Sequence, residues 1–101
     1  MRQPLPNRRV SNTIDFVHAV LRFSATYSRR ADGRLIELFI DAAKGSSALA
    51  DAARDAAVLA SLALQHGCEV ETLRHALTRN SDDEAAGPLG AALDLLEGSN
   101  Q

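Results

Sequence analysis

This chain of 101 residues contains a single cysteine, Cys68. One thiol cannot close an internal disulfide, which fits a reducing compartment, so we expect the protein to be cytoplasmic. No apolar run reaches the roughly 18 residues that a membrane-spanning helix needs. The basic N-terminus also lacks the apolar stretch of a secretory signal, and we therefore expect no membrane partner.

Aromatic residues are scarce as well: they make up 4% of the chain, and tryptophan is missing. An RNA-binding sheet would display several aromatic side chains. Three of the four aromatic residues in this chain (3 Phe and 1 Tyr) fall on strand faces that we assign to the core, so we expect no nucleic-acid partner. The content of 46% hydrophobic and 24% charged residues is ordinary for one globular domain.

Catalytic signatures are also missing. The chain has no Ser/His/Asp spacing and no glycine loop for a nucleotide, so we expect no catalytic residue and no cofactor. Glu37 and Asp55 could meet across a sheet–helix layer as a general acid/base pair. Solvated or arginine-paired carboxylates are the more ordinary reading of these two residues.

Two groups of potential metal ligands are incomplete. His66, Cys68 and His75 lack the fourth ligand of a closed zinc site. The acidic run Asp82-Asp83-Glu84 lacks the further spaced oxygen ligands that would hold a hard cation. We therefore expect no metal.

The sequence does contain three segments in which apolar and polar residues alternate. Apolar and polar residues alternate over Thr13–His18, Leu21–Arg29 and Arg34–Asp41, which predicts strands. Short turns at Ala19-Val20 and Ala31-Asp32-Gly33 separate them, so we expect a three-stranded antiparallel meander.

The third predicted strand is apolar on both faces. One face carries Ile36, Leu38 and Ile40, and the other carries Leu35, Glu37 and Phe39. A sheet that is covered on one side only does not need two apolar faces, so we expect something to cover the second face too.

A long alanine-rich helix follows, from a Ser46 or Ser47 cap to a stop at Gly67. Helical spacing predicts an inward stripe of Leu49, Ala52, Ala53, Ala56, Ala60, Ala63 and Leu64. It predicts an outward side of Asp51, Arg54, Asp55, Ser61 and Gln65. Val58 and Leu62 lie outside the inward stripe, so either the later helices or a second subunit should cover them.

Two shorter helices complete the chain. The first is predicted over Glu69–Arg79, and the second begins at Pro88 and ends at Gly98. The predicted fold class is α+β, with residues 12–98 as the single domain. Residues 1–11 are expected to be a flexible basic tail, and residues 99–101 a frayed end.

Two surface sites are candidates for function. At Lys44-Gly45-Ser46-Ser47 the free N–H groups of the helix start could bind a phosphate or another anion, although capping alone explains the same residues. The other candidate is a homodimer interface made by apolar residues that lack an assigned place in the core: Leu35, Phe39, Val58 and Leu62.

Several blocks of sequence together resemble one family. The blocks are 5–9 (LPNRR), 32–40 (DGRLIELFI), 44–46 (KGS), 54–57 (RDAA), 61–67 (SLALQHG) and 87–94 (GPLGAALD). The chain resembles small bacterial proteins of the TSCPD-domain group, a domain that also occurs at the C-terminus of adenosylcobalamin-dependent ribonucleotide reductases. The resemblance implies a small antiparallel sheet followed by helices.

The cysteine motif that names this group is absent, and Asn80-Ser81-Asp82-Asp83-Glu84 stands in its place. Ribonucleotide reduction needs several thiols and a cobalamin site, which one cysteine cannot supply, so the reductase activity is not implied. The resemblance implies at most a stand-alone, non-catalytic accessory or regulatory module. Together with the apolar interface residues, it leads us to expect a homodimer with a protein partner in nucleotide metabolism. The alternative function is a small nucleotide- or phosphate-binding domain that uses Lys44–Ser47.

Overall fold

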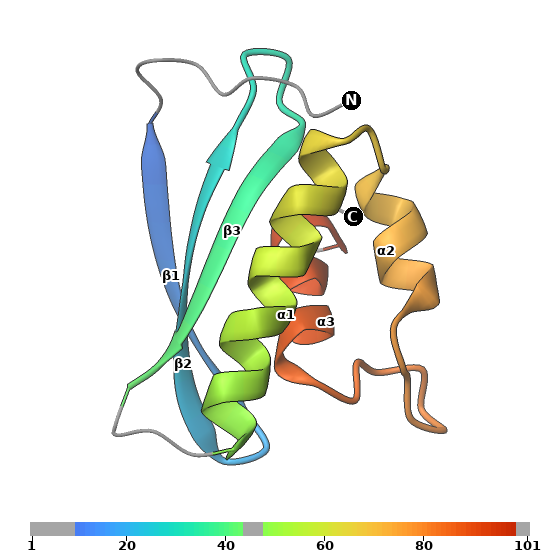
Figure 1. The fold of residues 1–101 in the computed structure, drawn as a ribbon. Coiled ribbons are helices and arrows are strands. Elements are labelled where there is room, and N and C mark those ends of the chain that lie inside the picture. Colours follow the sequence, from blue (N-terminus) through green and yellow to red (C-terminus); the bar gives the residue numbers. More distant parts are fainter. Residues whose placement is uncertain (1–9, 44–47, 99–101) are drawn as a thin grey trace.

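The computed structural model describes residues 10–43 and 48–98 and has the predicted α+β architecture (Figure 1). Strands β1 (Ser11–His18), β2 (Leu21–Arg29) and β3 (Leu35–Ala42) form one antiparallel sheet in the order β1-β2-β3. The meander and its two turns are confirmed. The strands begin or end within two residues of the predicted positions.

Three helices follow the sheet. Helix α1 spans Ala48–Gln65, α2 spans Val70–Ala76, and α3 spans Pro88–Leu93 and continues into a π-helix, η1 (Asp94–Gly98). Helix α2 is shorter than predicted, because Leu77 has extended backbone and the chain then folds back in a turn closed by an Arg79–Ala85 bridge.

The glycine stop of α1 is confirmed. Gly67 has a positive φ of 98°, its N–H donates to the Leu64 carbonyl at 3.1 Å, and the Cys68 N–H donates to the Ala63 carbonyl at 2.9 Å. This pair of bonds is a Schellman motif, which satisfies the last carbonyls of the helix.

The turn between β1 and β2 consists of two residues with left-handed backbone, Ala19 (φ 52°) and Val20 (φ 62°). A two-residue turn of this kind matches the twist of a hairpin, but it is normally built from Asn and Gly. A β-branched residue in this conformation is strained, and Val20 is 93% exposed, so packing does not compensate for the strain.

We expect Val20→Gly to raise the free energy of unfolding by about 1 kcal/mol, because glycine adopts this backbone without a Cβ clash. Urea denaturation measures the change. Ala31→Gly is the matched control, since Ala31 is also exposed, in the other turn, but has no positive φ. A Val20→Gly protein no more stable than the parent would show that the turn carries no strain.

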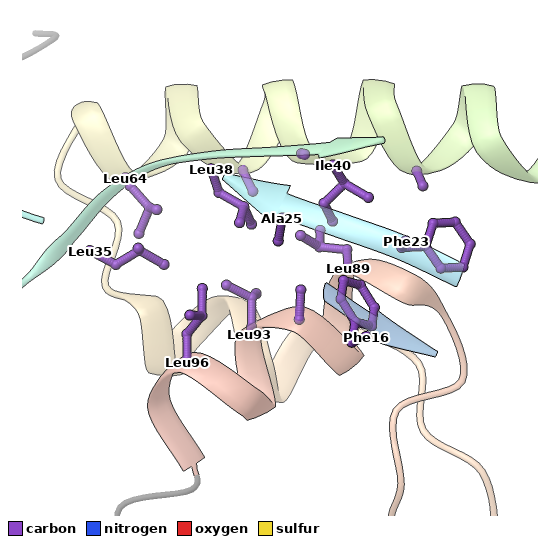
Figure 2. Close-up of a cluster of buried hydrophobic side chains, with 14 residues drawn as sticks. Phe16, Phe23, Ala25, Leu35, Leu38, Ile40, Leu64, Leu89, Leu93 and Leu96 are labelled. Atoms are coloured by element: carbon purple, nitrogen blue, oxygen red, sulfur yellow. The ribbon is translucent and has the colours of Figure 1, made fainter. Parts of the chain in front are cut away.

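The core lies between the sheet and the C-terminal segment. Figure 2 shows Leu89, Leu93 and Leu96 pointing from α3 and η1 toward the side chains of β2 and β3. On β1 and β2, Phe16 and Phe23 stack with ring centroids 5.6 Å apart. The short helix α3 therefore covers the inner face of the sheet, while α1 packs along β3 (Figure 1).

Leu35 corrects one prediction, because it is 4% exposed and belongs to the core. The pairing of β2 with β3 shifts between Ser28 and Arg29, so that Ser28 pairs with Glu37 but Arg29 pairs with Leu35. This bulge accommodates one extra residue on β3. It moves Leu35 from the outer to the inner face of the sheet, and Leu35 is therefore not an interface residue.

Ser61 and Gln65 correct a second prediction, since both are buried rather than outward-facing. The Ser61 hydroxyl accepts from the Leu38 N–H and donates to the Leu38 carbonyl, each at 2.8 Å. The Gln65 side-chain amide donates to the Ile36 carbonyl at 3.3 Å. These side chains close the outer edge of β3, whose backbone groups would otherwise be unpaired.

The alanine stripe of α1 is rotated accordingly. Its buried members are Ala50, Ala53, Ala57, Ala60 and Leu64, whereas Leu49 and Ala52 are exposed. Small side chains let the helix axis approach the strand closely enough for the serine to reach the backbone. Helical periodicity predicted the buried stripe of α1 only approximately, because it treats every polar residue as exposed.

Candidate interaction surface

Three apolar side chains lie exposed beside one another on β3 and α1. Phe39 and Val58 are each 44% exposed, and Leu62 is 37% exposed. We call Phe39, Val58 and Leu62 the contact strip. The later helices do not cover Val58 and Leu62. Of the two alternatives that the sequence left open, only coverage by a second subunit remains, and it stays a prediction.

Two bonds fix the position of the contact strip. Arg54 donates to Asp41 at 2.8 Å, and Ser61 bonds Leu38, so α1 runs antiparallel to β3. Val58 lies between Arg54 and Ser61 and therefore stands level with Phe39. Leu62 follows one helical turn later.

Two charged residues of α1 lie one helical turn before Val58: Arg54, which is paired with Asp41, and Asp55, which is exposed. Arg54 also donates to Asp51 at 2.8 Å, and the hydrogen bond to Asp41 raises the pKa of Arg54 above its ordinary value. Leu59, which sequence reasoning missed, is 66% exposed and extends the apolar surface around the helix. Its signal was present, because helical spacing places it outside the inward stripe.

A second charged cluster joins α2 and the following loop to η1. Arg79 donates to both carboxylate oxygens of Asp94 at 2.8 Å, and Arg74 donates to the same carboxylate at 2.9 Å. The hydrogen bond from Arg79, followed by that from Arg74, lowers the pKa of Asp94. Because the pKa of Asp94 is lower in the folded protein, its ionised carboxylate stabilises the fold at neutral pH. This stabilisation is lost as the pH falls through the lowered pKa, so the cluster has a structural role.

The predicted anion site, Lys44-Gly45-Ser46-Ser47, lies outside the described residues. Within them, α1 begins at Ala48.

The potential metal ligands are not brought together. Within residues 10–43 and 48–98, no group of three or more His, Cys, Asp or Glu side chains is placed to hold a metal ion. The acidic run lies in an exposed turn, where the Asn80 side-chain oxygen accepts from the N–H groups of Asp82 and Glu84.

The two carboxylates of the candidate acid/base pair lie in different environments. Glu37 is buried on the outer side of β3, and Asp55 is exposed on α1. Asp55 lies about a third of a turn around α1 from Ser61 and shares a face with Val58 and Leu62, which follow it by three and seven residues.

A cleft of about 390 Å³ lies between the β2–β3 turn and the turn after α1. Arg30 and Arg34 line it from the first turn, and Cys68, Glu69 and Glu71 line it from the second. The mixed charges and the single thiol do not form a nucleophile–base arrangement.

No helix among the described residues is both long and apolar enough to cross a membrane. The comparisons with known proteins give no relative: no family model matches the chain, and no significant match occurs among curated proteins or solved structures. The resemblance to the TSCPD-domain group stays a prediction.

Proposed function

We propose that this protein is a non-catalytic accessory or regulatory module that acts by binding other chains. It works as a homodimer and holds a protein partner through the contact strip. The proposed link to ribonucleotide reduction rests on the resemblance of the sequence to the C-terminal domain of the adenosylcobalamin-dependent reductases.

The observation that supports this proposal is the exposure of Phe39, Val58 and Leu62 beside one another on a helix and a strand that are hydrogen-bonded to each other. Leucine and valine four residues apart on a helix are the kind of anchors that a hydrophobic groove accepts. The neighbouring Arg54 is already paired with Asp41 and Asp51, so a partner does not have to neutralise it.

The size of the contact strip indicates a transient partner rather than a permanent one. A stable interface buries roughly 800 Å² on each side. Three side chains that are already more than half covered supply a small part of that area. The contact strip is therefore assigned to the regulated partner, and a different surface joins the two copies.

Purified adenosylcobalamin-dependent ribonucleotide reductase is the partner to test, by calorimetric titration with the full chain. The double variant Val58→Ser/Leu62→Ser should weaken binding by about tenfold, because it removes two central apolar anchors. Val20→Ser is the matched control, since it removes an apolar side chain that is even more exposed and lies in the β1–β2 turn. Absence of binding by the parent chain, or equal binding by all three proteins, would contradict the proposal.

A further inference from the structure

The two edge strands of the sheet differ in what covers their outward backbone groups. On β3, the outward N–H and carbonyl of Leu38 are bonded to Ser61, and α1 lies along the strand. On β1, the other edge strand, no described strand pairs with the outer side, although at the C-terminal end of β1 a ring nitrogen of His18 bonds the Ala86 carbonyl at 3.0 Å (Figure 1). The sheet therefore has one closed edge and one open edge.

The hairpin determines which backbone groups of β1 face outward. His18 and Leu21 flank the two-residue turn and form a hydrogen-bonded pair. Since bonded and non-bonded positions alternate along an antiparallel pair, the outward N–H and carbonyl groups belong to the alternate residues. These residues are Ser11, Thr13, Asp15 and Val17, and all four side chains are exposed. We call them the open edge.

The open edge lacks the usual protection against strand addition. Proteins block such edges with proline, lysine, a bulge or a covering segment. Strand β1 contains neither proline nor lysine, and its register with β2 is continuous over all eight residues. Asp15 is the one carboxylate on the strand.

We propose that a second copy of this chain pairs its own β1 antiparallel with the open edge, which joins the two sheets into one. This inference rests on the proposed function, which requires a dimer, and it specifies where the second copy binds. The occupant is a second copy because the edge is complementary to itself in one particular register.

That register centres Ile14 on Ile14 of the second copy. It overlaps Ser11–Val17 fully, and it bonds Thr13 to Asp15 of the second copy, so each carboxylate faces a hydroxyl. A register centred on Asp15 would place two carboxylates directly opposite each other, which is destabilising. The half-buried Ile14 side chains would meet on the inner face of the joined sheet.

A charge pair at position 13 tests this register. Thr13→Asp places a carboxylate opposite Asp15 of the second copy, twice per dimer, and should raise the dissociation constant about fivefold. Thr13→Lys places an ammonium there and should lower the dissociation constant by a similar factor. Both variants lose the same exposed bond to the Thr26 hydroxyl, 3.0 Å in the parent, so the loss of that bond does not distinguish them.

Sedimentation velocity at low salt measures the dissociation constant, and circular dichroism melting verifies that both variants fold. A parent chain that remains monomeric at its highest soluble concentration overturns the inference. A parent dimer whose two variants dissociate alike also overturns it, because the charge at position 13 then does not lie in the interface. Neither result decides the outcome of the reductase titration, since the contact strip lies on β3 and α1, at the other edge of the sheet from β1.

Discussion

Leu93→Ala should lower the free energy of unfolding by about 3 kcal/mol, the largest effect that we expect from a single substitution. The Leu93 side chain has no solvent exposure and lies in the core between α3 and the sheet (Figure 2). Its truncation removes apolar area from the core and leaves a cavity that a close-packed interior cannot fully collapse. Helix α3 has six residues and little stability of its own, so packing is what holds it in place.

Urea denaturation monitored by circular dichroism measures this loss. Leu95→Ala is the matched control, because Leu95 is two residues away and 47% exposed, so its truncation should cost well under 1 kcal/mol. Equal effects of the two substitutions would show that α3 does not cover the sheet in the way described.

Ser61→Ala should destabilise the protein by about 2 kcal/mol, because it leaves the buried N–H and carbonyl of Leu38 without their shared partner. Alanine has the higher helix propensity, so the propensity term opposes this loss by a few tenths of a kcal/mol. A net destabilisation would therefore result from the lost hydrogen bonds to β3 and not from a weaker helix.

Asp55→Ala is the control for Ser61→Ala, since it makes a polar-to-alanine change on the exposed side of the same helix. It should change stability by less than about 0.5 kcal/mol. A Ser61→Ala protein as stable as the parent would mean that α1 does not close the edge of β3 through this hydroxyl.

Local patterns predicted most of the fold. Strand alternation, the two turns, the glycine stop at Gly67 and the start of α3 at Pro88 are each encoded by a few neighbouring residues, and the structure has all of them. Such features follow from steric and hydrogen-bonding preferences of short segments, so they can be derived without knowing what packs against them.

The errors concern contacts between segments that are distant in the sequence. Helical spacing places Ser61 in solvent because a polar side chain on a helix normally faces water, and its partner Leu38 is 23 residues away. Strict alternation places Leu35 on the surface because it does not anticipate a bulge. In both cases a tertiary contact overrides the local pattern.

The candidate surface was predicted in part. Three of the four proposed interface residues are exposed, and Leu35 is not. The open edge was not predicted at all, because the sequence gives strand positions but does not say which edge a helix will cover. The partner of the contact strip and the second copy at the open edge remain proposals.

Amide hydrogen exchange measured at several protein concentrations tests the central claim, that α1 closes the edge of β3 while the edge of β1 is open to a second copy. The Leu38 amide should be protected at every concentration, because its partner is Ser61 in the same chain. The amides of Thr13, Asp15 and Val17 should exchange fast in dilute solution and become protected as the concentration rises. Exchange of these three amides that does not depend on concentration, or fast exchange of Leu38, would contradict the account.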